Sequence, residues 1–85
     1  MVSDVTPYAD LVVRVATQVL ESPVTLESNF FDAGGASLSA LALTSLIQEE
    51  LERDIPLDLV FEYPVLADFA REIAVLSESA SATAV

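Results

Sequence analysis

Four prolines divide this chain into helix-length segments, and this division constrains the fold more than any other feature. They stand at positions 7, 23, 56 and 64. Proline starts or ends a helix because it lacks the amide hydrogen and its ring clashes with the preceding turn. Between these breaks, apolar residues recur three and four positions apart, whereas no strand-length alternation or internal repeat is present. The pattern predicts an all-α fold, a small four-helix bundle with three long helices and one short helix.

The breaks also place the helices. Thr6 and Pro7 form a helix start, and Ser22 and Pro23 end the first apolar stripe. A long loop is expected from Ser22 to Ala36, held by its own apolar side chains. We expect helices over residues 7–21, 37–52, 57–62 and 65–76. Residues 77–85 have neither periodicity nor bulk, so we interpret them as a disordered tail that follows a folded domain of residues 1–76.

The inventory of side chains argues against an enzyme. The chain has 85 residues, too few to enclose a substrate pocket of several hundred cubic ångströms without emptying the core. It contains no histidine, cysteine or lysine, which are the usual general bases, thiol nucleophiles and Schiff-base amines. The same absence removes a zinc-type cluster, and no calcium-loop pattern is present. We therefore expect neither catalysis nor a metal site.

The net charge of the chain limits the kinds of partner that it can bind. The formal net charge is −11, and Arg14, Arg53 and Arg71 are the only basic side chains. Such a chain does not suit nucleic acid phosphates or an anionic membrane, and a basic protein surface is its natural partner. No apolar run approaches the about 20 residues that span a bilayer, and no leader pattern is present, so we expect a cytoplasmic protein.

The second predicted helix has more apolar surface than one buried face requires. Its seam consists of Ala40, Leu43, Ile47 and Leu51, at spacings of three and four. Further apolar residues lie off this seam, namely Leu38, Leu41, Ala42 and Leu46. Either this helix is unusually deeply buried, or the off-seam side chains form a docking face for a partner.

A serine stands where this helix begins, in the stretch "NFFDAGGASLSAL" from Asn29 to Leu41. Gly34 and Gly35 allow unusual backbone conformations and the close approach of another molecule. The first turn of a helix presents unpaired amides, which favour a phosphate. Ser37 therefore suits a phosphodiester attachment point. The local alternative is that Ser37 only caps the helix, as serines commonly do.

Two separated motifs resemble one family. "FFDAGGASL" is similar to the phosphopantetheine attachment signature of carrier proteins, in which two aromatics, an acid and a hydrophobic residue precede Gly-Gly-x-Ser-Leu. "IPLDLVFEYPVLADFA", residues 55–70, resembles the third and fourth helices of peptidyl carrier domains in nonribosomal peptide synthetases. The resemblance covers Pro7 to Leu76, nearly all of the expected domain.

The resemblance implies a carrier protein that is a substrate of other enzymes. Ser37 would be the attachment residue for 4′-phosphopantetheine, transferred from coenzyme A by a separate magnesium-dependent transferase. Adenylation or acyl-loading enzymes and condensation or tailoring enzymes would be the further partners. The attachment motif would comprise Gly34, Gly35, Ala36, Ser37 and Leu38. The partner-facing residues would be Leu38, Leu41, Ala42, Leu46, Val60 and Tyr63. The core would include Phe31, Leu43, Ile47, Phe61 and Phe69.

Several positions depart from the usual family pattern. Ala36 replaces a histidine or aspartate beside the serine, and Ala33 stands where leucine is frequent. Leu46 replaces a common arginine, which implies a more apolar partner surface. Val65 replaces a threonine often found after the proline, and the loss of this helix cap is expected to cost about 0.5 to 2 kcal/mol.

Three functions remain open from the sequence. The favoured one is a free-standing, monomeric aminoacyl or peptidyl carrier in nonribosomal peptide or hybrid polyketide biosynthesis. The second is a polyketide or fatty-acyl carrier of the same fold. The third is a docking module that is never modified.

Overall fold

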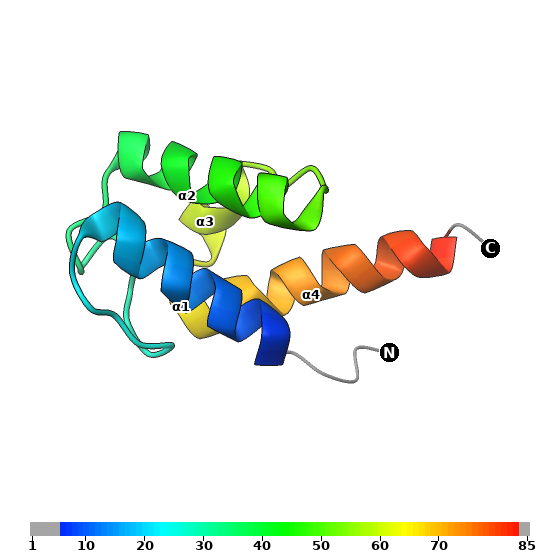
Figure 1. Cartoon of the computed structure of the whole chain (residues 1–85), viewed down its shortest axis with the longest axis horizontal. Coiled ribbons are helices and arrows are strands. Elements are labelled where there is room, and N and C mark those ends of the chain that lie inside the picture. Colours follow the sequence, from blue (N-terminus) through cyan, green and yellow to red (C-terminus); the bar gives the residue numbers. More distant parts are fainter. Residues whose placement is uncertain (1–5, 84–85) are drawn as a thin grey trace.

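Four helices make up the fold (Figure 1). A computed structural model describes residues 6–83, and it describes the side chains of residues 6–77. The helices are α1 (Thr6–Leu20), α2 (Ser37–Leu51), α3 (Asp58–Glu62) and α4 (Leu66–Thr83). The prediction of an all-α domain with three long helices, one short helix and a long first loop is confirmed. None of the helices within residues 6–83 combines the length and the apolar character that a membrane crossing requires.

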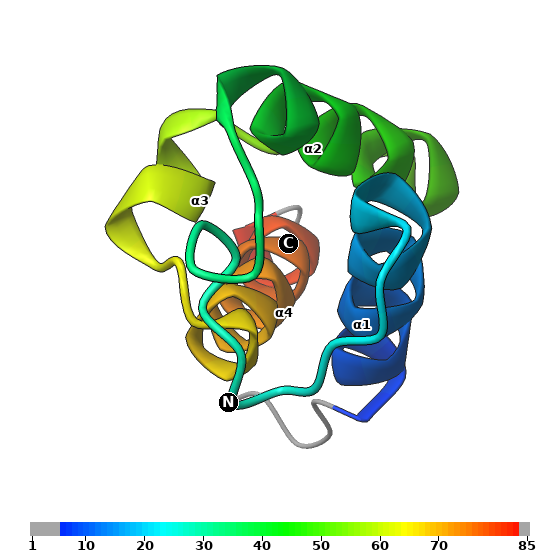
Figure 2. The ribbon, with the colours of Figure 1, turned by 90° about the vertical axis from the view of Figure 1, so that its left-hand side faces the viewer.

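The helices surround one apolar interior. Viewed nearly along α4, α1 lies to its right, α2 above it and α3 to its left, with the first loop passing in front (Figure 2). The buried stripe of α1 consists of Leu11, Val12, Val15 and Ala16, which recur at helical spacing. On α2 the buried residues are Ala40, Leu43, Thr44 and Ile47, so the predicted seam lies on the inside except for its last residue, Leu51, which is half-buried.

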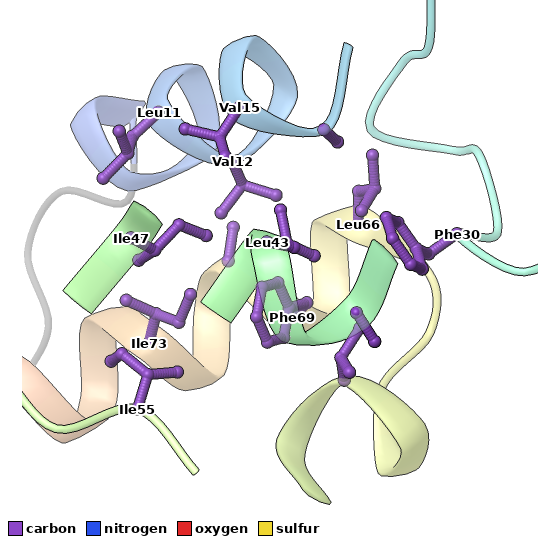
Figure 3. Packing of buried hydrophobic residues seen from close by; sticks show 14 residues of the cluster. Leu11, Val12, Val15, Phe30, Leu43, Ile47, Ile55, Leu66, Phe69 and Ile73 are labelled. Carbon is purple, nitrogen blue, oxygen red and sulfur yellow. The ribbon is translucent and has the colours of Figure 1, made fainter. Parts of the chain in front are cut away.

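The core is layered between α1, α2 and α4 (Figure 3). Phe69 and Ile73 of α4 are fully buried and lie near Leu43 and Ile47 of α2. Ile55 lies at one end of this cluster and Phe30 at the other. Leu43, Ile47 and Phe69 are buried, as the sequence indicated. Two other core predictions were wrong, because Phe31 is only half-buried and Phe61 is exposed.

The last helix is longer than predicted. We expected α4 to end at Leu76, but it continues through Thr83, and only residues 84–85 of the expected tail lie outside the described part of the chain. No proline or glycine follows Pro64, and alanine, which recurs in this segment, has the highest helix propensity. Nothing in the sequence therefore stops the helix at Leu76. Ser77, placed in the tail by the pattern, is a buried residue of α4.

The first loop, residues 21–36, is tied to the start of α4 by backbone hydrogen bonds. Phe30 donates its N–H to the carbonyl of Pro64 at 2.7 Å. In the other direction, the Leu66 N–H donates to the Ser28 carbonyl at 3.0 Å, and the Ala67 N–H donates to the Leu26 carbonyl at 2.9 Å. Loop carbonyls therefore satisfy two of the amides that the first turn of α4 leaves without an intrahelical partner. We expected the replacement of a threonine by Val65 to leave the start of α4 without a cap. The loop carbonyls provide part of that cap instead.

Candidate phosphopantetheine attachment site

Ser37 is the first residue of α2, and its side chain is exposed to solvent. The N-cap position belongs to Ala36, whose backbone is extended with φ −137° and ψ −177°, and no side chain caps the helix there. Ser37 thus lies one position inside the N-cap, and within the described residues its hydroxyl makes no hydrogen bond. The alternative that Ser37 serves only as the helix cap loses its structural basis.

A tight turn built on Asn29 precedes the serine. The Asn29 side-chain oxygen accepts hydrogen bonds from the N–H groups of Phe31 at 2.9 Å and Asp32 at 3.1 Å. Gly34 then takes a φ of +111°, which residues with a side chain rarely adopt. This turn reverses the chain just ahead of α2, so that Ser37 begins the helix at the surface.

Gly35 is required for a different reason: Phe30 leaves no room for a side chain at this position. Its N–H donates to the Phe30 carbonyl at 3.0 Å, so its α-carbon lies directly against Phe30. A β-carbon at Gly35 would lie 2.7 Å from that carbonyl oxygen and closer still to the Phe30 ring. Because the Phe30 ring is fully buried, it has no free direction in which to move. The paired glycines are therefore both explained, one by conformation and one by packing.

Three phenylalanines connect the first loop to α3. The ring of Phe31 meets the edge of the Phe30 ring at 5.4 Å between centroids, with the planes 85° apart. On its other side, Phe31 stacks on Phe61 of α3 at 5.2 Å and 15°. Aromatic pairs in these two geometries are worth about 0.5 to 1.5 kcal/mol beyond the area that they bury. The stack anchors the loop on the α3 side, opposite the hydrogen bonds to α4.

The start of α2 is electrostatically suited to an anion. The first hydrogen bond of the helix runs from the Ala40 N–H to the Ala36 carbonyl at 2.8 Å. The amides of Ser37, Leu38 and Ser39 precede it, and helix geometry gives them no partner inside α2. The first turn also contains no acidic residue. Unpaired amides and the positive end of the helix dipole both favour a phosphate at this position, so the residues present fit a phosphopantetheine group attached to Ser37.

The predicted partner-facing residues differ widely in exposure. Leu38 is 80% exposed and Leu41 is 49% exposed, so the first turns of α2 present a leucine pair to solvent. Ala42, Leu46 and Tyr63 are only half-buried. Val60 is fully buried in the core, so its predicted place on the partner surface was wrong.

The large apolar residue that α3 exposes is the next one along the chain, Phe61, which is 46% exposed. We expected Phe61 in the core and Val60 at the surface, which is the reverse of the structure. Leu57, an exposed apolar residue just before α3, was not predicted at all. The only sequence signal for these two exposed positions is the cluster of apolar residues between Pro56 and Pro64, and it does not say which of them face outward.

Leu46 lies in a shallow groove between α1 and α2. The groove has a volume of about 240 Å³ and is lined by Arg14, Val15, Gln18, Leu46, Glu49 and Glu50. Across it, the Arg14 guanidinium forms an ion pair with the Glu50 carboxylate at 3.3 Å, with both side chains largely exposed. Leu46 therefore contributes both to packing and to the surface, beside the Arg14–Glu50 ion pair.

A metal site does not accompany the serine in the part of the chain that the structure describes. Among residues 6–77, no three acidic side chains come close enough together to hold a metal ion.

Comparison with known proteins agrees with the geometry. The family model described as "Phosphopantetheine attachment site" matches residues 10–73. Tyrocidine synthase 2 of Brevibacillus parabrevis is 36% identical over 80 residues, which cover 93% of this chain and 2% of that protein. Surfactin synthase subunit 2 of Bacillus subtilis (strain 168) is 43% identical over 47 residues, covering 55% of this chain and 1% of that protein.

Bacitracin synthase 3 of Bacillus licheniformis is 38% identical over 56 residues, or 66% of this chain and 1% of that protein. The chain thus spans only one or two hundredths of the length of these relatives. No solved structure matches it. The family model covers most of the chain and all of the site described above. The chain therefore belongs to the phosphopantetheine attachment family, and it is a non-catalytic carrier domain related to the carrier regions of nonribosomal peptide synthetases.

Proposed function

We propose that Ser37 carries the phosphopantetheine arm and that this domain transports an aminoacyl or peptidyl group in nonribosomal peptide assembly. The observation that carries the proposal is the position of Ser37. It is an exposed hydroxyl in the first turn of α2, beside amides that have no partner in the helix and behind a turn whose two glycines cannot be replaced without strain or collision. No other hydroxyl of the described chain combines these features.

The modification transfers the phosphopantetheine moiety of coenzyme A. The Ser37 oxygen forms a bond to phosphorus, the pyrophosphate bond of coenzyme A breaks, and adenosine 3′,5′-bisphosphate leaves while the hydroxyl loses its proton. This chain has no histidine or lysine to accept that proton, which supports a separate transferase as the source of the base and the magnesium ion. When bound, the arm supplies the thiol that this cysteine-free chain lacks.

Partner enzymes would approach Ser37 from the side of the exposed leucines. Leu38 and Leu41 lie within the first turns of the helix that Ser37 begins, and Phe61 extends the apolar surface onto α3 through its stack with Phe31. We infer that the transferase, a loading enzyme such as an adenylation enzyme, and a condensation or tailoring enzyme bind there in turn. The net charge of −11 supports a carrier that acts in trans and reaches basic partners by electrostatic steering.

Intact mass spectrometry tests the attachment. The protein is incubated with coenzyme A, magnesium and a broad-specificity phosphopantetheinyl transferase. We expect one phosphopantetheine increment in the wild type and none in Ser37→Ala. Ser39→Ala is the matched control, because it removes a hydroxyl two residues further along the same helix and leaves the modification intact. An unmodified wild type, or a modified Ser37→Ala variant, would refute the assignment.

The cargo needs a second measurement on the modified protein. Loading with amino acids by adenylation enzymes is compared with loading by malonyl or fatty-acyl donors. The similarity to tyrocidine and surfactin synthases supports aminoacyl loading. Acceptance of malonyl or fatty-acyl groups alone would instead favour the polyketide or fatty-acyl carrier function.

A further inference from the structure

The start of α2 lacks the side-chain cap that helices normally carry. Ser, Thr, Asp or Asn at the N-cap accepts hydrogen bonds from the second or third amide of the helix, and alanine cannot. Here the N-cap is Ala36, and no side chain elsewhere takes over its role. The preceding turn does not help either, because the Asn29 oxygen is already bonded to Phe31 and Asp32.

The uncapped amides lie next to the proposed attachment oxygen. Ser37 is the first helical residue, so a phosphate bonded to its oxygen begins within the same helical turn as the amides of Leu38 and Ser39. A phosphodiester brings one negative charge and hydrogen-bond acceptors to the positive end of the helix dipole. The absence of an acidic residue in the first turn of α2 leaves nothing on that turn to repel this charge.

We propose that the phosphate of the arm acts as the missing N-cap of α2, so that modification stabilises the fold of this carrier. The inference rests on the proposed attachment at Ser37. It also explains the effect of Ala36, because in a chain with a side-chain cap at this position the phosphate would add less stability to the fold. The unmodified form has a weakly held first turn in α2, and the modified form has a firmly held one.

Thermal unfolding of the unmodified and modified forms tests the inference. A helix cap of ordinary strength corresponds to about 4–8 °C in Tm for a domain of this size, so the modified wild type should unfold higher by that amount. Ala36→Ser supplies a side-chain cap without charge. It should raise the Tm of the unmodified form and reduce the difference between the two forms by at least half. In about 1 M salt the wild-type difference should also shrink, because salt screens the charge part of the effect.

Ala42→Ser is the matched control. It introduces the same hydroxyl in the middle of α2, away from the first turn, and should leave the difference between the two forms unchanged. Hydrogen exchange gives a second, local readout on the wild type. The amides of Leu38 and Ser39 should exchange more slowly in the modified protein, while amides near the C-terminal end of α2 should not change.

The possible outcomes separate this inference from the proposed function. Mass spectra of every sample first establish complete modification. If Ser37 cannot be modified at all, both the carrier assignment and the capping role fail. If it is modified but the two forms unfold at the same temperature, the capping role is overturned and the carrier assignment stands. A difference in Tm that Ala36→Ser leaves unchanged, with Leu38 and Ser39 exchange unaffected, also overturns it.

Discussion

Replacing Gly35 with alanine should destabilise the domain through one specific collision. The added β-carbon would lie 2.7 Å from the Phe30 carbonyl oxygen and closer still to the Phe30 ring. That ring is fully buried and meets Phe31 edge-on, so it cannot turn aside without disturbing the stack onto Phe61. The backbone of Gly35 is also held, by the hydrogen bond from its N–H to the Phe30 carbonyl.

The expected loss combines two opposing effects. Forcing an extra carbon into a packed region costs about 1 to 3 kcal/mol. A glycine-to-alanine change also lowers the entropy of the unfolded chain, which returns about 0.4 to 1 kcal/mol. The midpoints of these ranges, about 2 and about 0.7 kcal/mol, leave a net loss of about 1.3 kcal/mol. With a denaturant slope of about 1 kcal/mol per molar urea for a small protein, the unfolding midpoint should fall by about 1.3 M.

Urea unfolding followed by the helical circular dichroism signal measures this loss. A double-mutant cycle with Phe30→Leu identifies the collision, because leucine lacks the ring atoms that the new carbon would meet. The loss from Gly35→Ala should be smaller by about 0.5 kcal/mol or more in that background. Gly34→Ala is the control. Its new β-carbon meets no atom within 4 Å, and its cost comes from the φ of +111°, so it should not depend on residue 30.

Two results would refute this reasoning. The first is a Gly35→Ala midpoint equal to that of the wild type. The second is an equal loss from Gly35→Ala with and without the Phe30→Leu substitution, which would mean that the ring is not the obstacle. The first result would remove the packing explanation for the second glycine of the motif, and the second would leave only the Phe30 carbonyl oxygen as the obstacle.

Three further substitutions test other parts of the structure. Gln48→Met removes the side-chain oxygen that accepts the Ile55 N–H at 2.8 Å, and leaving that buried amide unpaired should lower the free energy of unfolding by about 1 to 3 kcal/mol in urea melts. Glu52→Gly should raise the Tm, because Glu52 ends α2 at a φ of 53°, a left-handed conformation that costs a residue other than glycine about 1 to 2 kcal/mol. Leu46→Arg should weaken binding to the loading enzyme about tenfold, or about 1.4 kcal/mol, measured as the rate of cargo transfer at low carrier concentration. Unchanged transfer in a variant with a wild-type circular dichroism spectrum would mean that the apolar side chain at residue 46 does not serve the partner.

The limits of α1 and α2 could be predicted from the sequence because particular residue types mark them. The predicted starts and ends of α1 and α2 differ from the structure by at most one residue. Thr6, Pro7 and the Ser22–Pro23 pair mark the limits of α1, and α2 lies in the run without glycine or proline that follows Gly35. The end of α4 could not be placed in this way. Its last residues are compatible with a helix but lack apolar residues at helical spacing, so nothing in the sequence indicates that the helix continues there.

The short helix shows a different limit of sequence interpretation. With five residues, α3 has less than two turns, and apolar side chains occur at three successive positions from Leu59 to Phe61. Such a run has no period from which an inner face could be chosen. The choice is made by tertiary packing, since Val60 fills the core while Phe61 stacks on Phe31 from outside.

The residues of the attachment site could be predicted from the sequence, but the backbone hydrogen bonds that hold the first loop in place could not. Ser37, Gly34 and Gly35 form a motif of residue types, which a sequence displays. The hydrogen bonds from Phe30, Leu66 and Ala67 involve only backbone atoms, and such bonds leave no signature in the choice of side chain. The vacant cap at Ala36 was visible only as a departure from the family pattern, and its meaning depended on seeing which residue occupies the N-cap.

The pairing of the first loop with the entry to α4 also limits how carrier domains can be recombined. The segment that presents Ser37 is not self-sufficient, because its carbonyls and amides find their partners at Pro64, Leu66 and Ala67. A chimera that receives only residues 21–51 from this chain would place them against a foreign helix entry and lose the match between the two stretches of backbone. A graft that also includes residues 63–67 would bring both halves of the junction together. The natural unit of exchange is thus discontinuous in sequence, although it is a single contiguous part of the molecule.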